Sequence, residues 1–425
     1  MSAHSVPSPE DITREVLPNG IVVLARANFN SPSISISGSI EVGSLFDPDE
    51  KLGLADFVAD GLMRGTGKRN FQKIYDELES AGASLGFSGG THTTGFGGKA
   101  LAEDLDLILG LLAETLRQPV FPKDQIEKLR AQMLTSLALR AQSTGDMAGL
   151  AFDKLVYRSH PYGRPDDGYP ETIREITVED LQAFHRKIYG PRGMHIAIVG
   201  GVQPEKAIQK VRAAFGDWQN PQQPEPPALP EWRPLPESAS QRVAIPGKSQ
   251  SDLKVGTAGP PRGSEDYMAA SLGNNIFGSF GLMGRIGDVV REQAGLAYYA
   301  YSSLGGSIGP APWSVSAGVN PANEKKAIDL ITQEIRRFAA EKVTEEELSD
   351  SQTNYVGRMP LTLESNAGVA GALLHIERHN LGLDYYVRYP NIVRAVTREQ
   401  VLETAAKYLH PERLATAVAG PPNNK

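Results

Sequence analysis

The stretch Gly53-Leu-Ala-Asp-Phe-Val-Ala-Asp-Gly-Leu-Met-Arg-Gly-Thr66 decides the fold of this chain. Its apolar residues recur at the spacing of one face of a helix, and glycines flank the run. We therefore predict a helix here with one buried face. The apolar positions are Leu54, Phe57, Val58 and Leu62.

The polar positions of this helix are Asp56 and Asp60, which lie four residues apart and project from one face, with Ala59 beside them. The residues alone leave three interpretations of the aspartates open. They are remnants that face solvent, partners of a basic side chain, or weak oxygen ligands of a hard cation.

Composition sets outer bounds on fold and function. At 425 residues the chain exceeds what one hydrophobic core usually supports, so we expect two domains. A net charge of -7 argues against nucleic-acid and anionic-membrane partners. The absence of cysteine excludes disulfides and thiolate metal sites. No stretch resembles a signal peptide or a membrane span, and we expect a cytoplasmic protein.

The sharpest change in composition is the proline-rich segment NPQQPEPPALPEWRPLP, residues 220–236, which cannot continue a helix or a central strand. We interpret it as a linker. The predicted domains are therefore residues 1–219 and 239–425, joined by residues 220–238.

The N-terminal half predicts strands and helices in mixed order. An Asn-Gly turn at Asn19 predicts a hairpin, and Ser33–Val42 alternates apolar and polar residues as a half-buried strand does. Strands are predicted at Thr13–Leu17, Ile21–Ala25, within Ala83–Lys99 and at His195–Val199, and helices at Phe71–Ala81, Leu101–Arg117, Asp124–Arg140, Met147–Tyr157 and Val178–Ile188.

The C-terminal half repeats this order, and both halves close on a similar sequence. ITVEDLQAFHRKIYGPRGMHIAIVGG ends the first, and VTREQVLETAAKYLHPERLATAVAGP ends the second. In each, a threonine caps a helix, and a turn leads to a buried strand. The sequence thus predicts an α+β fold of two duplicated units, with antiparallel-rich sheets covered by helices. Predicted elements are Val255–Gly259, Tyr267–Phe277, Ala297–Leu304, Trp313–Val319 and Lys325–Lys342.

The 53–66 frame resembles the zinc-binding helix of the pitrilysin/insulinase-type metallopeptidases, the inverzincins. That family carries H-x-x-E-H at this place, followed by an apolar residue and Gly-Thr. The segment His160-Pro-Tyr-Gly-Arg-Pro165 and the duplication extend the resemblance over nearly the whole chain. It is most similar to short bacterial members and to the subunits of mitochondrial processing peptidase. The resemblance implies two homologous α/β-roll halves arranged as a clamshell.

The same resemblance implies that the zinc site is lost. Asp56 and Asp60 stand where the family has histidines, and Ala59 stands for the catalytic glutamate. The third ligand of the family falls on Ser136, in a helix with no acidic residue between Lys128 and Arg140. Zinc needs three donors at about 2.0–2.2 Å and an open position for water. We therefore expect no metal and no peptidase activity in this chain alone.

A second feature of the family is retained. The stretch Gly281–Tyr298 resembles the segment that places an arginine and a tyrosine across the cavity from zinc, and Arg291 and Tyr298 occupy these positions. Such donors hydrogen-bond substrate carbonyls and stabilise developing negative charge. The alternative is that Tyr298 packs in a strand and Arg291 forms a surface ion pair.

Two other motifs predict no function. The glycines of Phe277–Gly287 match neither phosphate-binding pattern and predict a flexible loop. In His375-Ile-Glu-Arg-His379, two histidines lie four apart, but Glu377 points away from their face, so we predict a polar helix surface.

The leading hypothesis is a non-catalytic, substrate-binding subunit of a heterodimeric zinc metallopeptidase. A homologous partner would bring the intact H-x-x-E-H motif and the zinc, and this chain would supply Arg291 and Tyr298 to a peptide substrate. The alternative is a non-enzymatic peptide-binding or scaffold protein of the same fold. A third hypothesis, an autonomous hydrolase with a relocated metal at Asp56, Asp60 or the His375/His379 pair, requires an unusual rearrangement.

Overall fold

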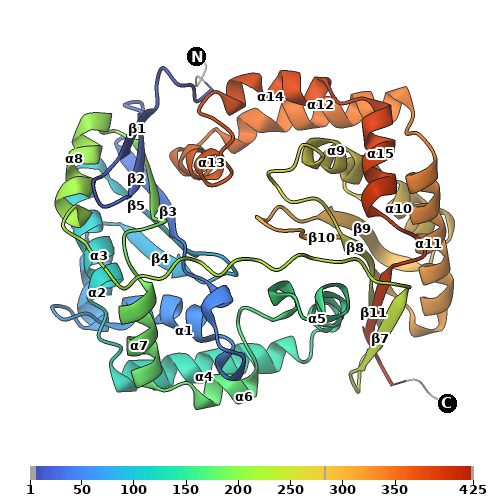
Figure 1. The fold of residues 1–425 in the computed structure, drawn as a ribbon, viewed down its shortest axis with the longest axis horizontal. Helices are drawn as coiled ribbons and strands as arrows, with labels where there is room; N and C mark the ends of the chain where they lie inside the picture. The colour runs from blue at the N-terminus through green and yellow to red at the C-terminus, as the bar shows by residue number, and fades with distance from the viewer. Residues whose placement is uncertain (1–5, 282–283, 423–425) are drawn as a thin grey trace. The chain divides into compact units, whose positions relative to one another are not determined.

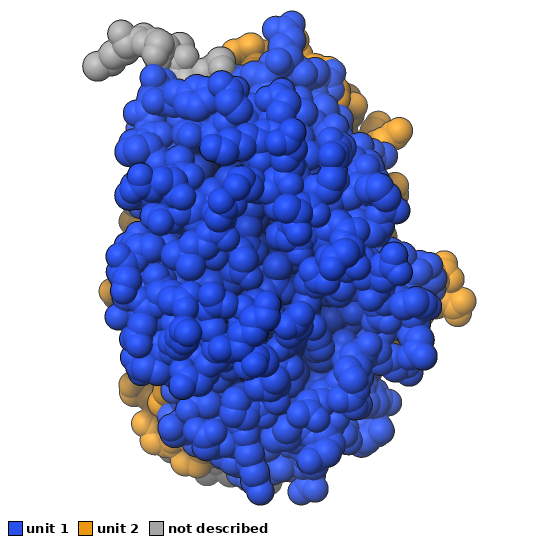
Figure 2. Space-filling model, turned by 90° about the vertical axis from the view of Figure 1, so that its left-hand side faces the viewer, with its two compact units in different colours: residues 1–137, 165–228, 359–387 blue, residues 138–164, 229–358, 388–425 orange. Residues whose placement is uncertain are grey.

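The computed structural model describes residues 6–281 and 284–422, and it divides into two compact units. Unit 1 comprises residues 1–137, 165–228 and 359–387, and unit 2 comprises residues 138–164, 229–358 and 388–425. Unit 1 forms one continuous surface on the face shown in Figure 2. Each unit therefore includes a segment from the other half of the sequence.

Unit 1 is built on a six-stranded mixed sheet in the order β1-β2-β6-β3-β5-β4. β2 pairs in parallel with β6, and the other pairs are antiparallel. The hairpin and the alternating strand predicted from the sequence are both present. The strands are β1 (Thr13–Val16), β2 (Val22–Ala27), β3 (Ser33–Ile40), β4 (Ser84–Ser88), β5 (Thr94–Leu101) and β6 (His195–Gly200).

Helices cover both faces of this sheet. Ile34, Ile36 and Ile40 of β3 point into the main core of the unit, toward the side where α3 and α8 pack. The opposite face of β3 and β6 contacts α13, a helix from far along the chain (Figure 1). The helices around this sheet are α1 (Leu54–Gly61), α2 (Phe71–Ser80), α3 (Leu105–Arg117), α4 (Lys123–Arg140), α6 (Pro170–Glu175), α7 (Val178–Ile188), α8 (Pro204–Phe215) and α13 (Asn366–Arg378).

Unit 2 contains a five-stranded sheet in the order β7-β11-β8-β10-β9. β7 pairs in parallel with β11, and the remaining pairs are antiparallel. This is the order of β2-β6-β3-β5-β4 in unit 1, so the duplication predicted from the sequence is confirmed by topology. The strands are β7 (Ala239–Ala244), β8 (Ser251–Ala258), β9 (Ala297–Leu304), β10 (Pro312–Val319) and β11 (Ala415–Gly420).

Helix α5 packs on one face of the unit 2 sheet, against β7, β8 and β11, while α9 and α11 pack on the other. The predicted threonine caps are present in both halves. Thr177 and Thr397 each form a capping box, with Asp180 and Gln400 respectively. The further helices are α5 (Thr144–Tyr157), α9 (Tyr267–Gly278), α11 (Glu324–Ala340), α12 (Glu345–Thr362), α14 (Tyr385–Arg394) and α15 (Arg398–Tyr408).

Several predicted boundaries differ from the structure, and β8 for example begins at Ser251 rather than at Val255. The expected helix Leu101–Arg117 begins as α3 only at Leu105, after a short 3-10 turn at Ala102–Asp104. Leu101 is instead the last residue of β5. Within the described residues, no helix combines the length and the apolar character that a membrane crossing requires.

Candidate functional site

The carboxylate of Asp47 fixes the start of the motif helix α1. Its two oxygens accept hydrogen bonds from the backbone N–H groups of Gly53 and Ala55, both at 2.9 Å. Gly53 has a φ of 93°, which costs glycine little. Asp47 is buried, and its negative charge interacts favourably with the helix N-terminus. The helix is therefore held in a defined position.

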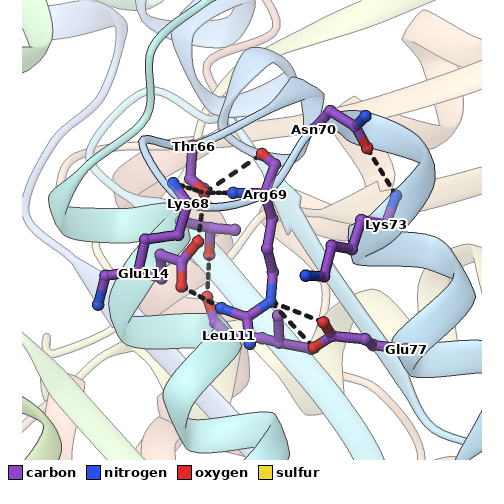
Figure 3. Close-up of polar contacts among 9 residues, drawn as sticks. Thr66, Lys68, Arg69, Asn70, Lys73, Glu77, Leu111 and Glu114 are labelled. Carbon is purple, nitrogen blue, oxygen red and sulfur yellow. Dashed lines mark hydrogen bonds and ion pairs between the residues drawn. The ribbon is translucent and has the colours of Figure 1, made fainter.

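A polar network fixes the turn that follows the helix (Figure 3). The hydroxyl of Thr66 donates to one oxygen of the buried Glu114, and the guanidinium of Arg69 donates to the other. Arg69 Nε also donates to Glu77 at 2.9–3.0 Å, and its backbone N–H donates to the Thr66 hydroxyl at 3.0 Å. These bonds tie the Gly-Thr of the motif to α2 and α3. The role of Thr66 here is structural.

A cavity of about 440 Å³ lies against the polar face of α1. The four positions singled out from the sequence, Asp56, Ala59, Asp60 and Ser136, all line it. The structure therefore brings the motif helix and α4 together as expected from the sequence. The other lining residues come from α1 and its following turn, α2, β4, α4 and a loop: Met63, Arg64, Tyr75, Gly86, Phe87, Leu129, Gln132, Met133, Leu137 and Asp167.

Asp56 is the half-buried carboxylate of this cavity. Burial raises its pKa to about 7, with further contributions from the negative charges of Asp60, Asp167, Asp166 and Asp47. Asp60 is more exposed, and desolvation also raises its pKa. Throughout the described part of the chain, no hydrogen bond or ion pair to the Asp56 carboxylate is present. The site therefore holds excess negative charge.

The residues around the cavity do not fit a zinc ion. Ala59 presents only a methyl group where a general base would act, and Ser136 presents a hydroxyl where a third ligand would be needed. Among residues 6–281 and 284–422, no group of three or more histidine, cysteine or acidic side chains is placed to hold a metal.

Two glycines of the β4 region shape the cavity. An added Cβ at Gly89 would lie 2.5 Å from Asp56 Oδ1, so this backbone packs closely on the aspartate. An added Cβ at Gly86 would meet nothing within 4 Å, and Gly86 lines the cavity.

On another wall of the cavity, Arg64 Nη2 donates a hydrogen bond to Gln132 Oε1 at 2.8 Å. The guanidinium is thus engaged with a neutral amide.

Tyr298 lies in unit 2, at an irregularity in the edge strand β9. Gly318 of β10 is opposite Tyr299, whereas the next residue, Val319, is opposite Ala297. Tyr298 is therefore the extra residue of a β-bulge, a feature that redirects side chains. Its side chain is 85% exposed. Tyr298 does not pack in the strand, contrary to the alternative considered from the sequence.

Arg291 lies on a short π-helix, Gly287–Gln293, that precedes this strand. Its Nε is 3.5 Å from an oxygen of the neighbouring Glu292, and its side chain is 40% exposed. This is the surface ion pair that the alternative predicted for Arg291, and it is a weak one that leaves guanidinium N–H groups available to a ligand. Leu282 and Met283 of the predicted segment lie outside the described residues.

The histidine pair of α13 belongs to unit 1. The ring centroids of His375 and His379 are 4.9 Å apart. Glu377 instead forms a two-pronged ion pair with Arg14 of β1, at 2.8 and 2.7 Å, which lowers the pKa of Glu377. The prediction that Glu377 points away from the histidines agrees with this contact.

Sequence reasoning missed Asp167, Arg64 and Gln132 as residues of the cavity. Asp167 belongs to an Asp-Asp pair in a Gly- and Pro-rich turn, which is a signal for a polar loop but not for its location. Arg64, in the turn after α1, meets Gln132 of α4 only through the tertiary fold, and no local pattern encodes that contact.

The chain is similar to known proteins along most of its length. Residues 22–165 match the model described as Insulinase (Peptidase family M16), and residues 175–355 match Peptidase M16 inactive domain. An uncharacterized zinc protease of Mycobacterium leprae is 27% identical, covering 96% of this chain and 92% of that protein. A probable mitochondrial-processing peptidase subunit beta of Arabidopsis thaliana is 27% identical, over 50% of this chain and 40% of its own.

A solved structure shares the whole fold. The crystal structure of a peptidase M16 inactive domain from Pseudomonas fluorescens superposes with a TM-score of 0.88 at 26% identity, covering 97% of this chain and 98% of that chain. The match to the inactive domain covers residues 175–355 of the present chain, whereas the residues that line the cavity, apart from Asp167, lie within the region matched by the insulinase model.

Proposed function

The chain belongs to peptidase family M16, the insulinase family, and on that premise we propose that it is the non-catalytic, substrate-binding subunit of a heterodimeric zinc metallopeptidase. The observation that carries the proposal is the composition of the cavity on α1. It keeps the architecture of a peptidase site, but Ala59 and Ser136 supply neither a base nor a ligand. Catalysis would therefore depend on zinc held by another chain.

Arg291 and Tyr298 give this subunit its part in the reaction. A guanidinium and a phenol both donate hydrogen bonds, and both are accessible here. Directed at the carbonyl of a peptide, they would bind substrate and stabilise the charge that develops during attack. Loss of one such donor typically costs about 3–4 kcal/mol of transition-state stabilisation.

The partner would be a homologous chain with an intact H-x-x-E-H motif, which supplies zinc and the general base. The Arabidopsis relative is named as a subunit of a processing peptidase, which supports the proposal that this chain also works as one subunit of a larger enzyme. The cytoplasmic location expected from the sequence stays a prediction, which fractionation of the native host would test.

Reconstitution tests the proposal directly. The chain is co-expressed with each homologue from its own genome that retains H-x-x-E-H, and co-purification and zinc-dependent cleavage of a peptide library are measured. We expect one homologue to co-purify and to cleave faster with this chain than alone. Chelation followed by zinc addition should remove and restore the activity.

Three outcomes contradict the proposal. If no partner's cleavage rate rises on addition of this chain, the subunit role is wrong. If the chain assembles only with itself and binds peptides without any cleavage, the alternative of a non-enzymatic peptide-binding or scaffold protein replaces it. Stoichiometric zinc in the purified chain would instead support an autonomous hydrolase.

A further inference from the structure

The cavity on α1 has walls of two chemical kinds. One set of side chains is apolar or aromatic, and the other is acidic. Because Asp60, Gly86 and Ser136 are exposed to solvent, the cavity opens to the surface. Its volume of about 440 Å³ is in the range that holds one long side chain or a small ligand. The apolar and aromatic walls are Met63, Tyr75, Phe87, Leu129, Met133 and Leu137.

The charges of the cavity are unbalanced. Asp56 makes no hydrogen bond or ion pair within the described residues, although it is half-buried. Arg64 is the cation among the described lining residues, and its guanidinium donates to Gln132 at 2.8 Å. A half-buried carboxylate without a partner is costly, and an entering cation would remove that cost.

Asp47 and Asp166 add negative electrostatic potential to the cavity, but their carboxylate oxygens already accept hydrogen bonds. Both oxygens of Asp47 accept backbone N–H groups at the start of α1. Asp166 accepts hydrogen bonds from the hydroxyls of Ser44 and Thr91. They make the cavity attractive to a cation. Of the two lining carboxylates that accept no such bond within the described residues, Asp56 and the exposed Asp60, Asp56 is the more buried and gains most from a cationic partner. No metal-holding group exists among the described residues, which disfavours a bare divalent ion.

We propose that this cavity binds the cationic side chain of a peptide, a lysine or an arginine, with the ammonium or guanidinium group on Asp56. The aliphatic stem of such a side chain packs on apolar walls while its head stays polar, which matches the two kinds of wall. The inference names a substrate class for the function proposed above and rests on it for its role in cleavage. Binding itself is a property of this chain alone.

The pH dependence of binding follows from the groups that face Asp56. These are Asp60 on the same helix, Arg64, Tyr75 and the loop residue Asp167, with Asp47, Asp166 and Tyr189 behind. A cation favours the ionised form of Asp56, whose pKa is about 7 in the empty cavity. Affinity should therefore rise as pH increases from about 6 to 8, with release of a proton on binding.

The test measures binding to the purified full-length chain by isothermal titration calorimetry. Capped pentapeptides that differ only at the central residue carry lysine, arginine, norleucine or glutamate, and putrescine serves as a free diamine. We expect the lysine and arginine peptides to bind about tenfold or more tightly than norleucine, as loss of a charged hydrogen bond predicts. The glutamate peptide should not bind.

Two variants localise the binding. Asp56→Asn removes the charge with the same shape and should abolish the preference for lysine over norleucine. Gly86→Leu places a side chain in open space within the cavity and should weaken all peptides, with the charge of Asp56 intact. Asp76→Asn, on an exposed site of α2, is the matched control and should bind as wild type. Circular dichroism and thermal unfolding verify that each variant is folded.

Equal affinity for lysine and norleucine, or an unchanged preference in Asp56→Asn, overturns the proposal. Binding of putrescine without binding of the lysine peptide overturns it in favour of a free polyamine. A chain that binds the lysine peptide but accelerates no partner's cleavage would contradict the proposed function and leave this inference standing.

Discussion

The hydroxyl of Tyr299 donates a hydrogen bond to Oδ1 of Asp252, two strands away in the unit 2 sheet. Both residues lie opposite Gly318, which occupies the strand between them. An added Cβ at Gly318 would lie 2.6 Å from Tyr299 Cε1, so the ring crosses directly over this glycine. The other oxygen of Asp252 accepts from Thr144 of α5. The hydrogen bonds among Tyr299, Asp252 and Thr144 therefore hold β9 in place at the bulge that exposes Tyr298.

Replacing Gly318 with alanine should therefore destabilise the protein. The new methyl group must displace the ring of Tyr299 and strain its bond to Asp252. We expect a loss of about 1–3 kcal/mol in the free energy of unfolding, measured by urea titration. The matched control is Gly357→Ala in α12, where an added Cβ meets nothing within 4 Å and should stabilise the helix by up to about 1 kcal/mol. Equal effects of the two substitutions would contradict the role given to Gly318.

The fold was largely predictable because its signals are local. The helical spacing within 53–66 and the alternation of β3 each record which face is buried. The repeated Thr-capped helix and strand also revealed the duplication, because both copies kept the same capping chemistry. The positions Asp56, Ala59, Asp60 and Ser136 meet at one cavity as the family frame implies.

The rest of the fold and of the site depends on tertiary contacts that no local sequence pattern encodes. The sequence gives no sign that α13 packs on the sheet of unit 1, or that α5 packs on that of unit 2. Tyr298 is exposed because of a one-residue bulge, whereas strict alternation along Ala297–Leu304 would not identify the extra residue.

Tyr298→Phe should lower the activity of the complex without changing the stability of the chain. The hydroxyl lies on a side chain that is 85% exposed, so unfolding of the isolated chain should be unchanged within about 0.5 kcal/mol. In the active complex, loss of one donor should lower kcat/KM by roughly a hundredfold. Tyr301→Phe, on the same strand and 38% exposed, is the control and should retain activity. Equal rates for wild type and Tyr298→Phe would remove Tyr298 from the proposed site.

Arg14 and Glu377 should be energetically coupled, because their ion pair joins β1 to α13. A double-mutant cycle with Arg14→Ala and Glu377→Ala should give a coupling energy of about 0.5–1.5 kcal/mol at pH 7. The pair lowers the pKa of Glu377, so its contribution is present above the unfolded pKa of about 4.3 and is lost as pH falls through the lower folded value. The pair Lys325 and Asp329, exposed on α11, should show weaker coupling. A coupling energy that stays constant down to pH 2 would contradict this origin.

Asp56 should make stability fall as pH rises. Its folded pKa is about 7, well above the value of about 3.9 in an unfolded chain, so the folded state holds more protons between these values. The free energy of unfolding contributed by this group is thus greatest below pH 4 and declines until pH 7, by on the order of 2–4 kcal/mol. Asp56→Asn cannot ionise and should lose this part of the decline.

Wild type must be compared with Asp56→Asn because Asp153 in unit 2 titrates in the same pH range as Asp56. Its pKa is raised to about 6 by burial, partly offset by Lys254. Wild type and Asp56→Asn share that contribution, so the difference between their urea-unfolding curves at pH 5 and pH 8 isolates Asp56. Relative to wild type, Asp56→Asn should be more stable at pH 8 than at pH 5, whereas Asp76→Asn should show no such change. A difference that does not vary with pH would mean that Asp56 keeps an ordinary pKa, so that burial and the neighbouring acids do not disfavour its charged form.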